Sequence, residues 1–212
     1  MKHIRGVCRV LYALCLPYVL NSVLGPVLGA CLLASAPAIA AAPAAQLPGD
    51  SLYRTPLVLQ DQQGRKFDLA SVRGKPVIVS MFYASCTSAC PLTVDTIDQT
   101  RRAVDAAGRT APPVLMISFD PEHDDVLNLA AMAKAHQLDP AYWRVTRPAS
   151  GDVMAFAATL GIAYRHRAGG DISHNAVIAL LDENGRVIAQ TTVVGALDPA
   201  FVDAVKAQVA KH

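Results

Sequence analysis

The first 49 residues of this 212-residue chain contain no acidic side chain, and residues 10–49 contain no charged side chain at all. This absence excludes the front of the chain from the folded domain that we expect further on. Lys2, Arg5 and Arg9 stand before the apolar run, and a basic start followed by a long apolar stretch is typical of an export signal or a membrane anchor. We therefore expect residues 1–42 to direct the protein to the periplasm or to the periplasmic face of the inner membrane.

Three fates of the export segment stay open. It can be a cleaved signal peptide, since small residues at 34–45 offer cleavage sites. It can be a retained anchor that associates with the membrane through residues 10–33, which are long enough to span, although Pro17 and Pro26 weaken them as a helix. It can also be a lipoprotein signal, because the sequence Leu-Gly-Ala-Cys that ends at Cys31 is similar to a lipobox. The apolar residues after Cys31 argue against that third fate.

Runs of Lys and Arg are also missing, and beyond residue 42 the basic and acidic side chains nearly balance. This absence excludes a basic stripe of the kind that binds nucleic acid. Residues 43–56 are rich in Pro and Ala and predict a tether. The remaining residues, 57–212, have a suitable length for a single hydrophobic core, so we expect one domain there.

Cysteine is scarce beyond the export segment, where only Cys86 and Cys90 remain. A framework of several disulfides is therefore excluded. In an oxidising compartment, two cysteines four positions apart are expected to react with each other or to bind something.

Apolar runs and turn residues beyond residue 56 predict an α/β fold. The run 76–83 is apolar almost throughout, which suits a strand that is buried on both faces of a sheet. Strands separated by helices imply a parallel core, so we expect a thioredoxin-like three-layer sandwich with a central mixed sheet and an N-terminal hairpin. The predicted strands are 57–60, 66–69, 76–83, 114–119, 176–181 and 186–194, and the predicted helices are 92–107, 126–136, 152–160 and 199 to the C-terminus.

Cys86 and Cys90 directly follow the most apolar strand and open a helix. Functional groups gather at the carboxyl ends of strands in such sheets. Free N–H groups at a helix start favour thiolate, so the pKa of Cys86 should fall. A separation of four places both sulfurs on one face of a helical turn, where they can hold a soft ion such as Cu(I) or Zn(II). The same pair could close into a disulfide.

His174 is the candidate for a third ligand. It lies just before the predicted strand 176–181, and the chain has no proline between Gly151 and Asp198. Thioredoxin-like oxidoreductases carry a cis-proline in the corresponding loop, facing the cysteines. Two sulfurs and one imidazole nitrogen at this point suit a copper site.

Less specific interpretations stand beside these. The cysteine pair could be a structural disulfide, and His174 alone could be a surface histidine. Asp120 and Asp124 follow a predicted strand and are interpreted mainly as caps of the next helix, with a secondary role in shaping the site or a partner surface. Trp143 is expected in the core.

Six segments spread over the predicted domain carry a joint pattern. They are Asp61 to Gly64 with Phe67 and Leu69, Gly74-Lys75-Pro76, Phe82-Tyr83-x-x-Cys86-x-x-x-Cys90-Pro91, Ser118-Phe119-Asp120-Pro121-x-x-Asp124, His174, and Asp182 to Gly185. In these segments the sequence resembles the Sco/SenC family of copper-binding cytochrome c oxidase assembly factors. The loop around His174 departs from the usual family pattern, with Ser173 before it and Asn175 after it where the family usually has Asp and Ser. The residues between the cysteines also lack the proline and the acidic residue that are often found there.

The resemblance implies a metallochaperone that binds one copper ion, Cu(I) or Cu(II), through Cys86, Cys90 and His174. Its partner would be the copper-receiving subunit of a respiratory oxidase, with a thiol reductant protein as a further partner. An alternative is a thiol–disulfide oxidoreductase that reduces a client disulfide, with Cys86 attacking and Cys90 resolving the mixed disulfide. A copper or redox sensor is the third hypothesis.

Overall fold

A seven-stranded sheet forms the centre of the computed structural model, which describes residues 46–151, 153–166 and 172–211. The strand order is β2-β1-β5-β4-β3-β8-β9, and β6 and β7 form a separate pair. In chain order the elements are η1 (Leu52–Arg54), β1 (Val58–Asp61), β2 (Lys66–Asp68), η2 (Leu69–Val72), β3 (Val77–Phe82), α1 (Ala89–Asp105), β4 (Val114–Ser118), α2 (Val126–Ala135), β5 (Trp143–Ser150), α3 (Val153–Thr159), β6 (Tyr164–His166), β7 (Ile172–His174), β8 (Ile178–Leu181), β9 (Val187–Thr191) and α4 (Pro199–Val209).

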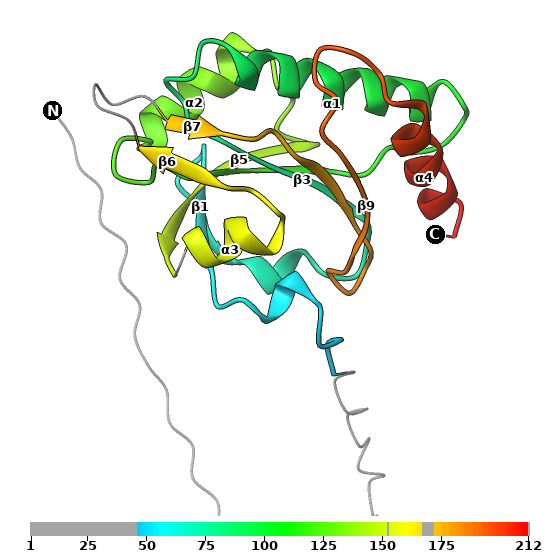
Figure 1. Ribbon diagram of the computed structural model, residues 1–212, viewed down its shortest axis with the longest axis horizontal. Helices are drawn as coiled ribbons and strands as arrows, with labels where there is room; N and C mark the ends of the chain where they lie inside the picture. Colours follow the sequence, from blue (N-terminus) through cyan, green and yellow to red (C-terminus); the bar gives the residue numbers. More distant parts are fainter. Residues whose placement is uncertain (1–45, 152, 167–171, 212) are drawn as a thin grey trace, which may run out of the picture. The chain divides into compact units, whose positions relative to one another are not determined.

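The sheet is the middle of three layers, with α1, α2 and α4 over one face and α3 with the two short 3₁₀ turns over the other (Figure 1). Every residue of β3, β4 and β8 is buried, because helices cover both faces of these strands. This arrangement confirms the predicted thioredoxin-like mixed sheet and its N-terminal hairpin, which β1 and β2 form. The carboxyl end of β3 leads directly to the two cysteines.

The sequence prediction omitted β5, which lies inside the sheet between β1 and β4. This strand has no continuous apolar run, since it contains Arg144, Arg147 and Pro148. Some of its groups have partners that are distant in sequence. The side chain of Gln62 donates to the Trp143 carbonyl and accepts the Val145 N–H, and Arg147 donates to the Pro121 carbonyl at 2.8 Å. Periodicity within a short window cannot register such partners.

The predicted strand 176–181 contains β8, which pairs antiparallel with β3 and so makes the sheet mixed, as predicted. The short hairpin of β6 and β7 between α3 and β8 was not predicted. One further expectation is corrected. The end of the predicted tether belongs to the core: Leu52 and Tyr53 are buried, and the Leu52 N–H donates to the Gly185 carbonyl at 2.9 Å.

The export segment, with Cys31, lies outside the described residues, so its three fates stay open. No helix in the described part of the chain is long and apolar enough to cross a membrane.

Candidate metal centre

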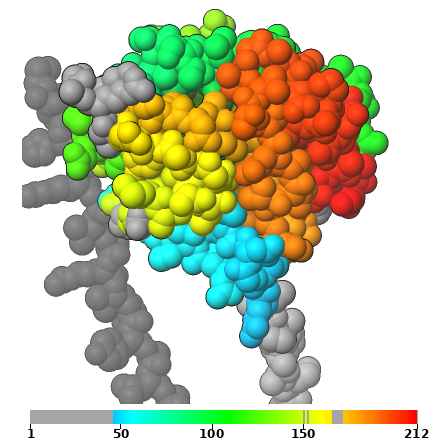
Figure 2. Space-filling model, viewed as in Figure 1, coloured from blue at the N-terminus to red at the C-terminus, as the bar shows by residue number. Residues whose placement is uncertain are grey.

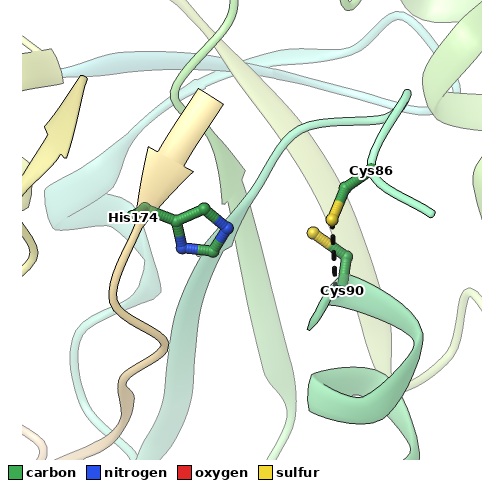
Figure 3. Close-up of side chains that lie close together, drawn as sticks. All are labelled: Cys86, Cys90 and His174. Atoms are coloured by element: carbon green, nitrogen blue, oxygen red, sulfur yellow. Dashed lines mark hydrogen bonds between the residues drawn. The ribbon is translucent and has the colours of Figure 1, made fainter. Parts of the chain in front are cut away.

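Cys86, Cys90 and His174 come together from three separate elements. Cys86 lies in the loop after β3, Cys90 is the second residue of α1, and His174 is the last residue of β7. Their sulfur and nitrogen ligand atoms all lie within 4.8 Å of one another. Figure 3 shows the imidazole ring of His174 pointing toward the two sulfurs.

The sulfur of Cys86 caps the helix that carries Cys90. Helix α1 begins at Ala89, three residues earlier than predicted, and its N-cap residue Ser88 makes no side-chain capping bond. The Cys90 N–H instead donates to the Cys86 sulfur over 3.3 Å (Figure 3). One of the free N–H groups of the first turn is thus satisfied by sulfur rather than by oxygen. The cysteine pair therefore lies at the helix start, with Cys86 before the helix and Cys90 in its first turn.

The two thiols have opposite acidity. Partial burial of Cys86 works against its ionisation, but hydrogen bonds from the Cys90 thiol and from the backbone N–H groups of Ser88 and Cys90 outweigh it and lower its pKa. Cys90 is only 3% exposed, and this burial, together with its hydrogen bond to the Cys86 sulfur, raises its pKa. The predicted fall in the pKa of Cys86 is confirmed, and Cys90 is the protonated partner in the free protein. Both cysteines are free thiols in the structure.

Asp124 anchors the loop that carries Cys86. Its carboxylate accepts the Ala84 N–H at 3.0 Å and the hydroxyl of Ser118, and its side chain is buried. Burial raises the pKa of Asp124, while the hydrogen bond from Ser118 opposes that rise. The helix cap predicted here is corrected, because Asp125 caps α2 by accepting the Asn128 N–H at 2.8 Å. The sequence signal for the anchor was an acidic residue following a fully buried strand.

Aromatic rings surround His174. The imidazole centroid lies 4.8 Å from that of Phe119 and 6.0 Å from that of Tyr83, and Tyr164 stacks on Phe119 at 5.1 Å. The Nδ1 atom of His174 lies 3.1 Å from the carbonyl oxygen of Asn175. A carbonyl oxygen can only accept a hydrogen bond, so Nδ1 carries the hydrogen and donates it, which leaves the lone pair of Nε2 free for a ligand bond.

The donor set suits a soft ion. Two sulfurs and one imidazole nitrogen are the ligands that Cu(I) and Zn(II) prefer, and they exclude hard cations. Bonds of about 2.0–2.3 Å to each donor fit three donors that lie within 4.8 Å of one another after a small inward shift of side chains. The site reaches the surface, where the segment of β7 borders the start of α1 and the loop after β9 (Figure 2). His123, an exposed histidine in the loop after β4, pairs with Asp120 at 2.8 Å and is not part of the group.

The fold and this site define a thioredoxin-like protein with an open Cys-Cys-His group. The SCO1/SenC family model matches residues 45–209, and the chain belongs to this family. The resemblance seen in the sequence is thereby confirmed.

Solved structures agree in fold. Arabidopsis thaliana ScoI with copper bound is 18% identical, with 74% of this chain and 94% of that chain covered and a TM-score of 0.58. A SCO1/SenC family lipoprotein from Bacillus anthracis is 18% identical over 73% and 95% of the two chains, with a TM-score of 0.61. BsSco, a member of the Sco family of cytochrome c oxidase assembly proteins, is 18% identical over 74% and 93%, with a TM-score of 0.60. No curated protein sequence matches the chain.

Proposed function

We propose that this protein is a copper metallochaperone that holds one copper ion as cargo on the sulfurs of Cys86 and Cys90 and on Nε2 of His174. The observation that carries the proposal is the convergence of these three ligand atoms within 4.8 Å. Membership of the SCO1/SenC family and the copper bound to Arabidopsis ScoI support the choice of copper over zinc.

The receiving partner that we propose is the copper-binding subunit of a respiratory oxidase. BsSco, a similar structure, is a member of the Sco family of cytochrome c oxidase assembly proteins, and this supports the proposed partner. A periplasmic location is consistent with the apolar, non-acidic start of the chain and with the lipoprotein of Bacillus anthracis. A fusion of alkaline phosphatase to the C-terminus tests this location, because the reporter is active only outside the cytoplasm.

The side chains have distinct roles in loading. Cys86 is partly exposed and the more acidic thiol, so its thiolate is the first ligand that an arriving ion meets. Cys90 is buried and protonated, and it must release its proton before its sulfur can bind. His174 provides the third ligand, and its ring packs against Phe119 and Tyr83. Because the buried thiol gives up a proton on binding, affinity should fall as the pH falls.

A competitive Cu(I) titration of the reduced protein tests the site. We expect one tightly bound equivalent. Loss of a hydrogen-bond partner of a ligand lowers metal affinity by about 10- to 100-fold. Loss of a ligand itself should lower the Cu(I) affinity by more than this in each of three variants, Cys86→Ser, Cys90→Ser and His174→Ala. His123→Ala is the matched control, since His123 pairs with Asp120 outside the group, and it should bind like the unchanged protein. Tight binding that is insensitive to all three site variants would refute the assignment.

A second function, thiol–disulfide reduction, is favoured by the opposite acidity of the two thiols. The Cys86 thiolate would attack one sulfur of a client disulfide, forming a mixed disulfide and releasing the other client sulfur as a thiolate. Cys90, after losing its proton, would attack the sulfur of Cys86 and release the client. Two electrons pass to the client, and the Cys86–Cys90 pair ends as a disulfide.

His174→Ala separates the two functions. The variant should lose tight Cu(I) binding but should reduce a disulfide-containing client peptide at a rate close to that of the unchanged protein, because the imidazole takes no part in thiol exchange. Loss of reduction with copper binding intact would contradict both assignments.

A further inference from the structure

Asn175 follows the histidine of the site and makes three hydrogen bonds to one short segment. Its side-chain oxygen accepts the Ala163 N–H at 2.8 Å, and its side-chain nitrogen donates to the Gly161 carbonyl at 2.9 Å. Its backbone N–H donates to the Ala163 carbonyl over 3.4 Å. The pairing of β6 with β7 ends at Tyr164 and His174, so Asn175 continues it by one residue with its side chain.

This anchoring fixes the one carbonyl that His174 contacts. The Asn175 carbonyl oxygen lies 3.1 Å from Nδ1 of His174, and no other hydrogen bond of the imidazole is found in the described part of the chain. A residue held at its N–H and at both ends of its side-chain amide has little freedom to turn its carbonyl away. The direction of that carbonyl therefore depends on the side chain of Asn175.

The aromatic rings near His174 do not fix which way round the imidazole ring lies, but the Asn175 carbonyl does. Phe119 and Tyr83 pack against the imidazole, but the contacts of a flat ring do not by themselves distinguish it from the same ring after a half-turn about Cβ–Cγ. Such a flip exchanges Nδ1 with Cδ2 and Nε2 with Cε1, so a carbon would face the sulfurs. In Figure 3 a ring nitrogen faces the cysteines. Only this orientation lets Nδ1–H donate to the Asn175 carbonyl.

We propose that Asn175 is a positioning residue that selects the ring orientation and the Nδ1–H tautomer of His174, and so presents Nε2 to the ion. The proposal rests on the proposed function for its copper readout, but the orientation and the tautomer are properties of the metal-free protein. Partners that fix the far nitrogen of a ligating histidine contribute about 10- to 100-fold to metal affinity. Because the amide of Asn175 lies at an exposed site, its removal should barely change the free energy of unfolding.

The test uses the full chain in mild detergent, labelled with ¹⁵N-histidine, as Asn175→Ala, Asn175→Asp and Asn128→Ala. The matched control is Asn128, whose amide donates to the His123 carbonyl at 2.7 Å, away from His174. Long-range ¹H–¹⁵N spectra of the metal-free protein, assigned with His174→Ala, should show Nδ1–H alone in the unchanged protein and in Asn128→Ala. In Asn175→Ala we expect a mixture of tautomers and a fall in Cu(I) affinity of about 10- to 100-fold.

Asn175→Asp keeps an acceptor for the Ala163 N–H. Compared with Asn175→Ala, it should therefore show more of the Nδ1–H tautomer and a higher Cu(I) affinity. An unchanged tautomer and affinity in Asn175→Ala overturn the proposal and leave the proposed function standing. Absence of tight Cu(I) binding by the unchanged protein refutes the proposed function, while the tautomer spectra still decide the role of Asn175.

Discussion

Replacing Asp124 by Ala should destabilise the protein and disturb the thiol site together. The substitution removes the acceptor of the Ala84 N–H and of the Ser118 hydroxyl. An unsatisfied buried group costs about 1–3 kcal/mol. Two effects reduce the total for the two groups: Ala84 is only partly buried, and removing the buried carboxylate also removes its desolvation cost. We therefore expect the free energy of unfolding to fall by about 2–4 kcal/mol. Because Ala84 precedes Cys86 by two residues, alkylation of Cys86 should also change.

Asp124→Asn gives the contrast, since its side-chain oxygen can still accept the Ala84 N–H, and the buried charge is gone. We expect it to cost less than about 1 kcal/mol. Burial raises the pKa of Asp124 in the folded state, so its ionisation opposes folding above its unfolded pKa. The unchanged protein should therefore gain stability relative to Asp124→Asn as the pH falls through that raised pKa.

Urea denaturation of the reduced protein, followed by fluorescence of the buried Trp143, measures these differences. Asp125→Ala is the control, because it removes the cap of α2 at a cost of about 1 kcal/mol and should leave Cys86 reactivity unchanged. Equal losses in the Ala and Asn variants, or an Asp124→Ala protein as stable as the unchanged one, would refute the anchoring role.

Three more outcomes are expected. Gly185→Ala should cost about 2–5 kcal/mol in urea denaturation, because a Cβ there lies 2.5 Å from the ring of Tyr53 at a φ of +80°. Gly74→Ala, at a φ of +97° with open space, should cost only about 1–2 kcal/mol, and equal losses would contradict the clash. Iodoacetamide at limiting concentration should modify Cys86 before Cys90. The rate of Cys86 alkylation should fall with decreasing pH, with a midpoint below that of a free cysteine peptide. Preferential labelling of Cys90 in mass spectra would overturn the assignment of Cys86 as the more acidic thiol. Oxidation of the Cys86–Cys90 pair should abolish Cu(I) binding in a competitive titration, with full recovery after reduction, whereas binding by the oxidised form would exclude thiolate ligands.

Local patterns predicted much of the fold. The apolar runs at β3, β4 and β8 identify strands with two buried faces, and Asp198 with Pro199 predicts the start of α4, where the Asp198 carboxylate accepts the Ala200 N–H. The strand β5 was missed because Arg144, Arg147 and Pro148 interrupt its apolar run, and its partners are Gln62, which bonds the backbone of Trp143 and Val145, and the Pro121 carbonyl, which accepts from Arg147. Such partners are distant in sequence, and no short window contains them.

The sequence by itself determined the chemistry of the site: two cysteines at a strand end, a distant histidine, and the absence of a proline beside it. Residue types and spacings carry this information, because soft ligands and helix starts are local properties. Cys86, the thiol expected to attack, is the more exposed of the two, as predicted. Only the tertiary structure decided which nitrogen of His174 faces the sulfurs, and which hydrogen bonds Asp124 and Asn175 make beside the site. These features depend on burial and on hydrogen bonds between elements far apart in the chain, which exist only after folding has brought them together.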